Sequence, residues 1–155
     1  MKLLVLSDSH NALTFMLDAV GREEPDMVIH LGDYARDTLA IRARFPDMPL
    51  RYVRGNCDFN ADCADMEMLE VCGRKVFITH GHLYGVKNGL DRITRFGASA
   101  DADLVLFGHT HRAYIAKSGT MTIMNPGAAG GRAGERGKTY GVAHVDEAGV
   151  QCKIL

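Results

Sequence analysis

Short continuous apolar runs alternate with segments of helical periodicity over the first two thirds of the chain. Runs of strand length that are rich in valine, isoleucine, leucine and phenylalanine are typical of strands covered on both faces. They predict strands over residues 3–6, 27–31, 51–54 and 104–107. Between them, apolar residues recur at the spacing of one helix face, which predicts helices over residues 11–23, 38–45 and 89–100. Asn11 is expected to be the N-cap of the first helix.

The remaining apolar segments are short and are separated by turns that contain glycine. Two of them flank Cys72-Gly73-Arg74 and predict a hairpin of residues 66–71 and 75–79. The last third of the chain predicts further short strands over residues 112–117, 120–124, 140–145 and 150–154. The chain therefore begins as βαβ units and ends as a β-meander, which favours an α/β protein with more than one sheet.

Length and composition favour one ordinary globular domain over residues 1–155. A chain of 155 residues is long enough to build its own core, and 46% of the residues are hydrophobic while 24% are charged. The formal charge of −1 argues against a broad basic surface, so nucleic acid is not the expected partner and a nuclease is disfavoured, although it stays open. The N-terminal apolar run stops at Ser7, which is too short for a signal peptide or a membrane span. Because the four cysteines form no Cys-x-x-Cys pair, we expect reduced thiols and a cytoplasmic location. From the charge and the short apolar run we expect no membrane association.

Polar side chains with metal-binding chemistry follow five of the predicted strands. They stand at or just beyond the carboxyl ends of these strands: Asp8 and His10, Asp33, Asn56, His80, and His109 and His111. In open α/β sheets the carboxyl ends of the strands form the crevice in which ligands bind. In an extended chain, residues two positions apart point the same way, so the Asp-x-His pair and the His-x-His pair should each face one point.

These seven side chains predict a centre with two metal ions. Imidazole, carboxylate and amide donors without a thiolate suit Mn²⁺, Fe, Zn²⁺, Ni²⁺ or Co²⁺ better than Ca²⁺. Seven donors are too many for one tetrahedral ion, but they suit two ions about 3.5–4 Å apart that share a carboxylate. We expect Mn²⁺ ahead of the other metals.

The ordered motifs resemble those of the calcineurin-like metallophosphoesterases. The motifs are Asp8-Ser9-His10, Gly32-Asp33, Gly55-Asn56, His80-Gly81 and Gly108-His109-Thr110-His111. Any one of them occurs by chance, whereas all five in this order are specific. The small size of the chain and its Gly-Asn-Cys-Asp variant look most like the small prokaryotic phosphodiesterases of that superfamily.

The resemblance implies a double-layered β-sandwich flanked by helices, which is the four-layer metallophosphoesterase fold, with two metals at its rim. It assigns Asp8, His10 and His111 to one metal, Asn56, His80 and His109 to the other, and Asp33 to a bridge between them. A hydroxide that bridges the metals would attack phosphorus in line, and we expect Asn56 and His109 to act in catalysis as well as in binding. The implied activity is that of a metal-dependent phosphodiesterase on small phosphate esters.

One position departs from the family pattern. The usual motif is Gly-Asn-His-Asp/Glu, whose histidine is proposed to protonate the leaving group, and this chain has Cys57 there. A neutral thiol is a poor general acid, and a general acid contributes about 10²–10⁴-fold, so we expect a preference for good leaving groups. We expect Asp58 to support the ligands rather than to bind metal. His82 is expected to touch the substrate or support a ligand, whereas His30 and His144 are expected to be structural.

Other interpretations compete with this one. A retromer subunit of the same fold is a protein-binding scaffold with a degraded metal site, whereas all seven ligand types are present here. Gly137-Lys138-Thr139 matches the last three residues of the phosphate-binding P-loop motif, but Arg132 stands where that motif needs its first glycine. We expect instead that the loop with Arg132, Arg136 and Lys138 borders the substrate. The oligomeric state stays open, because an exposed sheet edge or face would allow a homo-oligomer to form.

Overall fold

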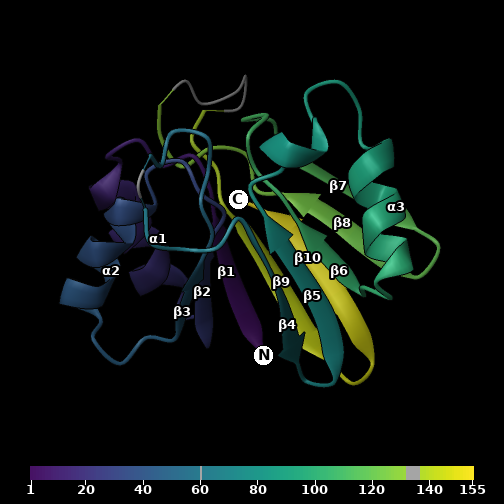
Figure 1. Cartoon of the computed structure of the whole chain (residues 1–155). Helices are drawn as coiled ribbons and strands as arrows, with labels where there is room; N and C mark the ends of the chain where they lie inside the picture. Colours follow the sequence, from purple (N-terminus) through teal and green to yellow (C-terminus); the bar gives the residue numbers. More distant parts are fainter. Residues whose placement is uncertain (60, 132–136) are drawn as a thin grey trace.

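Two β-sheets face each other in the computed structural model, which describes residues 1–59, 61–131 and 137–155 (Figure 1). In spatial order, the described part of the first sheet contains β10 (Gly149–Ile154), β9 (Gly141–Asp146), β1 (Lys2–Leu6), β2 (Met27–His30) and β3 (Leu50–Tyr52). The second contains β4 (Met66–Val71), β5 (Arg74–Thr79), β6 (Leu104–Leu106), β8 (Met121–Asn125) and β7 (Tyr114–Ser118).

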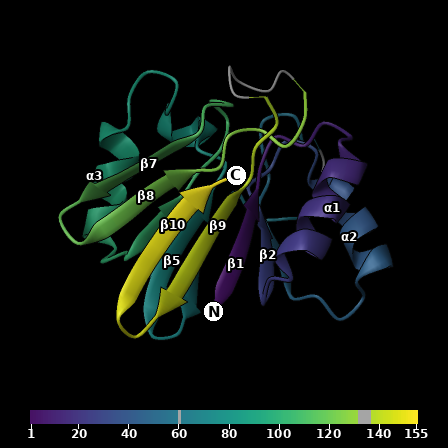
Figure 2. The ribbon, with the colours of Figure 1, turned by 180° about the vertical axis from the view of Figure 1, so that it is seen from behind.

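Helices cover the outer faces of both sheets. The helices α1 (Leu13–Glu23) and α2 (Thr38–Arg44) lie on the side of the first sheet, and α3 (Asp91–Ser99) lies on the side of the second (Figure 1 and Figure 2). Two 3-10 turns, η1 (Ala35–Asp37) and η2 (His82–Tyr84), follow β2 and β5. The predicted double-layered sandwich flanked by helices is confirmed. None of the helices in the described ranges is long and apolar enough to cross a membrane.

Strand β1 shows why its sequence is a continuous apolar run. Leu3 and Val5 belong to the core between the two sheets, whereas Leu4 and Leu6 pack with the helices on the other side. All four side chains are fully buried. Burying one such side chain contributes roughly 1.5–3 kcal/mol relative to leaving it exposed, so β1 anchors two layers of the core at once.

The first helix begins later than the sequence predicts. Asn11 is not its N-cap: α1 begins at Leu13 after Ala12, and the backbone of Asn11 is left-handed, with φ 66°. The amide of Asn11 donates to Oδ2 of Asp37 at 2.7 Å, so this residue is held by the connection after β2 rather than by the helix. The other predicted helices and strands are found, with ends that differ by a few residues.

The predicted hairpin is confirmed, but β5 begins one residue earlier than expected. Val71 pairs with Arg74, so Cys72 and Gly73 alone make the turn. Both have positive φ, 49° and 72°, as two-residue turns that match the twist of a hairpin require.

The predicted β-meander is wrong, because the last four strands belong to two different sheets. Strands β7 and β8 form a hairpin in the second sheet, where β8 pairs in parallel with β6. Strands β9 and β10 form another hairpin in the first sheet, where β9 pairs with β1. Without β9, one edge of the buried strand β1 would expose unpaired amides and carbonyls, so the chain crosses from one sheet to the other to cover it.

Candidate metal centre

The carboxyl ends of β1, β2, β5 and β6 meet at one rim of the sandwich, where hydrogen bonds tie the two sheets together. Nδ1 of His80 lies 2.8 Å from the carbonyl oxygen of Leu31, and the amide of His109 donates to Oδ2 of Asp8 at 3.1 Å. Each bond joins a loop of one sheet to a loop of the other. The rim therefore brings together residues that are far apart in the sequence.

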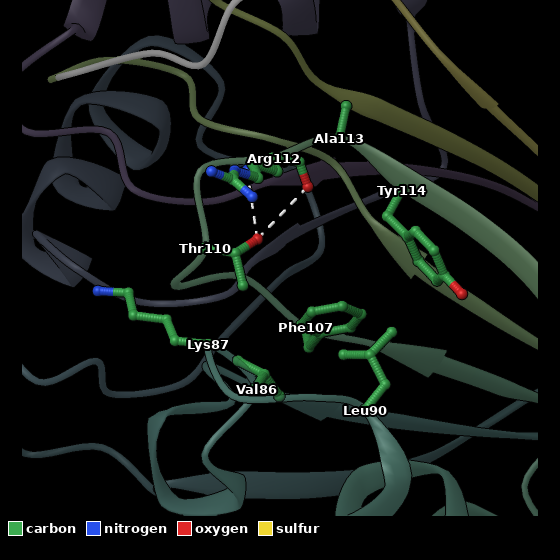
Figure 3. Close-up of a pocket in the computed structure, with 8 residues that line it drawn as sticks. All are labelled: Val86, Lys87, Leu90, Phe107, Thr110, Arg112, Ala113 and Tyr114. Atoms are coloured by element: carbon green, nitrogen blue, oxygen red, sulfur yellow. Dashed lines mark hydrogen bonds between the residues drawn. The ribbon is translucent and has the colours of Figure 1, made fainter.

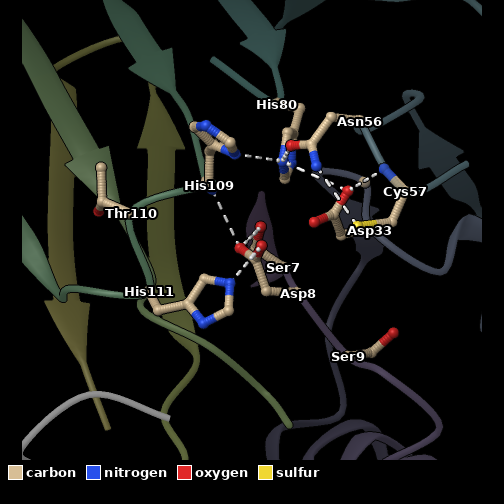
Figure 4. A network of polar contacts seen from close by, with 12 residues as sticks. Ser7, Asp8, Ser9, Asp33, Asn56, Cys57, His80, His109, Thr110 and His111 are labelled. Carbon is tan, nitrogen blue, oxygen red and sulfur yellow. Dashed lines mark hydrogen bonds and ion pairs between the residues drawn. The ribbon is translucent and has the colours of Figure 1, made fainter. Parts of the chain in front are cut away.

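The predicted ligands gather in this region (Figure 4). Candidate ligand atoms form two groups: Asp8, His10, Asp33 and His111, and Asp33, His80 and His109. Within each group, all the atoms lie within 4.8 Å of one another. Oδ1 of Asn56 lies beside the second group, 3.2 Å from Nε2 of His80. Asp33 belongs to both groups, which is the position that a bridging carboxylate would need.

Around His80, atoms that carry lone pairs face one another. Because Nδ1 of His80 donates to the carbonyl of Leu31, its Nε2 carries no proton in the neutral ring. That nitrogen faces two oxygen acceptors, Oδ1 of Asn56 at 3.2 Å and Oδ1 of Asp33 at 3.5 Å. It also lies 3.1 Å from Nδ1 of His109. A cation among these atoms would bind all of their electron pairs at once.

The first group contains a buried carboxylate oxygen that needs a partner. Oδ2 of Asp8 accepts hydrogen bonds from Oγ of Ser7 at 2.6 Å and from the amide of His109. Oδ1 of the same carboxylate accepts no well-directed hydrogen bond from the described residues, although Nε2 of His111 lies 3.0 Å away. This oxygen therefore depends on a single contact, and incomplete pairing of a buried acceptor is destabilising. Nitrogen and oxygen donors around such a carboxylate fit a divalent metal ion.

The surroundings of the centre keep its side chains in forms that bind metals. Burial is the largest cause that lowers the pKa of His109 to about 4, and the positive charge of Lys87 lowers it further. Burial alone would raise the pKa of Asp8, but the close contact with His111 and the hydrogen bond from Ser7 oppose it, and this pKa lies below its usual value. At neutral pH the centre therefore presents a neutral imidazole and a charged carboxylate.

Five of the predicted ligands have a left-handed backbone. Their φ values are 53° at Asp8, 42° at His10, 55° at Asp33, 67° at His109 and 57° at His111. Asp8 and His10 belong to the same group, but His109 and His111 belong to different groups, so the prediction that the His-x-His pair faces one point is wrong. The extended backbone expected for both pairs is absent. A left-handed backbone costs roughly 1–2 kcal/mol at an ordinary residue, and such conformations cluster at functional sites.

Two glycines allow the loops to approach one another closely. A Cβ on Gly108 would overlap Oγ of Ser7 and lie 2.9 Å from Oδ2 of Asp8. A Cβ on Gly55 would overlap both the amide nitrogen and Oδ1 of Asp33. Any side chain at either position would therefore push a carboxylate out of the centre.

Asp58 holds together the two loops that carry Asp33 and Asn56. Its Oδ1 accepts a hydrogen bond from the amide of Ala35 at 2.9 Å, and its Oδ2 accepts one from the amide of Gly55 at 2.8 Å. Both oxygens thus serve backbone amides, which agrees with the expected supporting role.

A buried chain of hydrogen bonds that the sequence analysis missed supports the ends of β1 and β2. The amide of Gly32 donates to Nδ1 of His30 at 3.2 Å, so the proton of the neutral ring is on Nε2, which lies 3.0 Å from Oγ of Ser9. Ser9 in turn donates to Oδ2 of Asp37 at 2.7 Å. Burial lowers the pKa of His30 to about 4, so the ring is neutral. The signal in the sequence is a histidine inside an otherwise apolar strand, since a buried polar group requires partners.

His82 lies beside the second group of ligands. Its ring centroid is 5.4 Å from that of His80 and 6.1 Å from that of His109. Its Nδ1 is buried and has no hydrogen-bond partner among the described residues. Contact of His82 with a substrate stays a prediction. His144 is exposed on β9.

Asn125, at the end of β8, supports the loop that carries His109 and His111. Nδ2 of Asn125 donates to the carbonyl of Gly108 at 2.8 Å and to Oγ1 of Thr110 at 3.1 Å, so it holds the His-Thr-His loop. Nζ of Lys138 lies 5.8 Å from the ring centroid of Phe15. The other two cations expected to border the substrate, Arg132 and Arg136, lie outside the described residues.

Comparison with known proteins identifies one family. The model of the calcineurin-like phosphoesterase superfamily domain matches residues 1–148. The probable metallophosphoesterase YsnB of Bacillus subtilis is 35% identical over 131 residues, which are 83% of this chain and 75% of that protein. Phosphodiesterase YfcE of Escherichia coli is 26% identical over 170 residues, which cover 94% of this chain and 89% of that protein.

Solved structures share the fold. A conserved protein of Streptococcus pneumoniae TIGR4, described as a predicted phosphoesterase, has a TM-score of 0.81 at 24% identity and covers 99% of this chain and 88% of that chain. Vps29 of Entamoeba histolytica in complex with zinc has a TM-score of 0.78 at 18% identity, with 100% of this chain and 98% of that chain covered. At these identities the likeness shows the fold alone.

The close packing at Gly108 gives a test of the rim. Gly108→Ala should lower the free energy of unfolding by about 1–3 kcal/mol, because the added methyl group displaces buried Ser7 and Asp8. The matched control is Gly21→Ala, where a Cβ in helix α1 would meet nothing within 4 Å. The control should raise the free energy of unfolding by roughly 0.5–1 kcal/mol. Urea denaturation measures both, and a Gly108→Ala protein as stable as the wild type would contradict the close approach of the two loops.

Proposed function

The chain belongs to the calcineurin-like phosphoesterase superfamily, and we propose that it hydrolyses small phosphodiesters with two divalent metal ions. Membership in this family makes the protein a metal-dependent phosphoesterase. The diester preference is supported by the relative YfcE, which is named a phosphodiesterase and aligns with 94% of this chain. The two-metal centre is supported by the chain's own donors.

The observation that carries this proposal is the shared position of Asp33. The first ion would be held by Asp8, His10 and His111, and the second by Asn56, His80 and His109. A carboxylate oxygen of Asp33 lies within 4.8 Å of the other candidate ligand atoms of each group, so this carboxylate would join the two ions. We propose Mn²⁺ for both positions, with Ni²⁺, Fe, Zn²⁺ and Co²⁺ as alternatives, because all of these accept nitrogen and oxygen donors.

The residues of the chain provide the order and charge that hydrolysis needs. When bound, two divalent ions supply Lewis-acid binding of the phosphoryl oxygens and make water a stronger nucleophile. The carboxylates of Asp8 and Asp33 neutralise only part of the charge of two such ions, so the centre would attract an anionic ester. The imidazole of His109 stays neutral, and Nδ1 of His80 is held by the carbonyl of Leu31, so their free nitrogens remain directed at the centre.

We also propose that residues 1–155 form a single domain, because the first sheet joins both ends of the chain. Strand β1 pairs with β9, and β9 pairs with β10. A cytoplasmic location and a homo-oligomer stay predictions.

Removal of Asp33 tests the centre directly. Asp33→Asn and His109→Ala should each lower the Mn²⁺-dependent hydrolysis of bis(4-nitrophenyl) phosphate at least about a hundredfold, because each removes a ligand. His144→Ala is the matched control, since this histidine is exposed on β9, and it should keep the wild-type rate. Thermal unfolding gives a second measurement, because Mn²⁺ at about a hundred times its Kd should stabilise the wild type by about 2.7 kcal/mol for each ion bound. Asp33→Asn should lose most of that stabilisation.

Three outcomes would decide against parts of this function. Two bound ions per chain without turnover in Mn²⁺, Ni²⁺ or Mg²⁺ would contradict the enzyme and favour a protein-binding scaffold like the retromer subunit. One bound ion per chain would contradict the shared role of Asp33. Wild-type activity in Asp33→Asn would remove the centre from the mechanism.

Cys57 lies at the edge of the centre as a neutral thiol. Its Sγ is 3.3 Å from Nδ2 of Asn56, and its amide donates to Oδ1 of Asp33 at 2.8 Å. Burial, and then the neighbouring carboxylate of Asp33, raises the pKa of the thiol to about 11. A thiol this weakly acidic gives little help to a leaving group.

Cys57→His should therefore restore general-acid catalysis. We expect kcat for diesters with alkoxide leaving groups to rise about tenfold or more, while kcat for 4-nitrophenyl esters changes little, because 4-nitrophenolate needs no proton. The slope of log kcat against the pKa of the leaving group measures this and should become shallower. Cys72→His, in the exposed turn between β4 and β5, is the control and should keep the wild-type slope. An unchanged slope in Cys57→His would contradict the expected role of this position.

A further inference from the structure

A cavity of about 510 Å³ opens beside the candidate metal centre (Figure 3). It lies between the segment after η2 and the loop that leads into β7. The buried side chains of Val86 and Phe107 line it, together with the partly exposed Leu90 and Tyr114. Binding pockets for small molecules typically measure roughly 300–1,000 Å³, so this cavity has room for a substituent of that kind.

Thr110 joins the cavity to the metal centre. It lines the cavity, and its two chain neighbours are the candidate ligands His109 and His111. Oγ1 of Thr110 accepts hydrogen bonds from the amide of Arg112 at 3.2 Å and from Nδ2 of Asn125 at 3.1 Å. Figure 4 shows Thr110 on the same loop as the two histidines, and Figure 3 shows it at the cavity. A phosphate ester at the centre would therefore have the cavity within reach of one of its substituents.

The apolar lining fits a flat ring. Phe107 is 1% exposed and Val86 4%, so both are fixed, and the Tyr114 ring lies 6.5 Å from the Phe107 ring, centroid to centroid. Tyr114 is 41% exposed, which leaves much of its ring available to a ligand. Aromatic pairs at such separations are stabilised by edge-to-face or offset stacking beyond the burial of area.

The border of the cavity adds positive charge. Lys87 and Arg112 both line it and are exposed, and neither side chain forms an ion pair with any residue of the described ranges. Two such cations beside an apolar pocket complement a ring that carries a negative group.

We propose that this cavity binds one substituent of the diester, an aromatic group that carries its own negative charge, and that Tyr114, Lys87 and Arg112 set this specificity. The proposal rests on the proposed function, because it places the reacting phosphate at the metal centre. An aromatic ring with an acidic substituent and a nucleoside with a second phosphate share this chemistry.

Three diesters with one leaving group test the aromatic part. Methyl, phenyl and 4-carboxyphenyl 4-nitrophenyl phosphate all release 4-nitrophenolate, so differences in kcat/KM report on the other substituent. We expect kcat/KM to rise about tenfold from methyl to phenyl. In Tyr114→Ala this ratio should fall towards one. Ile115→Ala is the matched control, because Ile115 is the next residue of β7, is 40% exposed and does not line the cavity, and it should keep the wild-type ratio.

The same esters test the charged part. We expect the carboxylate to raise kcat/KM about threefold over phenyl, since exposed ion pairs are weak. In the double variant with Lys87→Gln and Arg112→Gln this increment should disappear, while the ratio of phenyl to methyl stays. High salt should reduce the increment in the wild type for the same reason.

A binding measurement separates failure of this proposal from failure of the proposed function. 4-Carboxybenzylphosphonate has no ester bond to cleave, so it reports on the cavity even in a protein without turnover. With Mg²⁺ present, which is diamagnetic, it should shift the backbone amide NMR signals of Val86, Leu90 and Tyr114 in the wild type, and less in Tyr114→Ala. Shifts without hydrolysis of any diester would support the cavity and contradict the proposed function.

Two results would overturn the cavity as the specificity pocket. One is hydrolysis of all three diesters with equal kcat/KM in the wild type. The other is a ratio of phenyl to methyl that Tyr114→Ala leaves unchanged, as expected if the cavity received a protein segment instead. Amide shifts that are absent at these residues would also contradict binding there.

Discussion

The contact between His80 and the carbonyl of Leu31 fixes the chemistry of the rim. It spans the two sheets at 2.8 Å and assigns the ring proton to Nδ1. As a result, Nε2 of His80 turns a lone pair towards Oδ1 of Asn56 and Oδ1 of Asp33. Loss of the contact would free the ring to rotate, and the second group of ligand atoms would lose its shape. The sandwich fold therefore has two roles: it buries the core between the sheets, and it orients Nε2 of His80 at the rim.

The rim contains several destabilising features, and burial in the core of the fold offsets them. Five candidate ligands have left-handed backbones, and at least one buried carboxylate oxygen lacks a well-directed donor in the described structure. The strands beneath are buried on both faces, with Leu3, Leu4, Val5 and Leu6 all at 0% exposure. A rigid core of this kind holds strained loops in place, and strain of this kind is typical of sites shaped by binding rather than by folding.

The sequence predicts the elements and the ligand residues better than it predicts how they are brought together. Apolar runs that end in Asp, Asn or His mark the strand ends, because burial on both faces leaves a continuous signal. Pairing between distant strands leaves no such signal, so the residues of β9 do not indicate that this strand pairs with β1. The same applies to Asn11. Its amide donates to Asp37, which lies in the connection after β2, and no local pattern indicates this bond. Left-handed backbones at non-glycine residues are equally hidden, because tertiary contacts impose them against local preference.

The metal centre and the cavity beside it differ in what holds them. The centre needs loops from both sheets, and hydrogen bonds such as that from the amide of His109 to Asp8 connect them. The cavity is lined by residues from segments 86–90 and 107–114, which belong to the second sheet and its connections. Substitutions at Tyr114 or Lys87 therefore leave the bonds between the sheets in place. Arg112 differs, because its amide holds Thr110 between the two histidines, but its guanidinium is free of that contact. The selectivity for a substituent can thus change while the ligand geometry is kept.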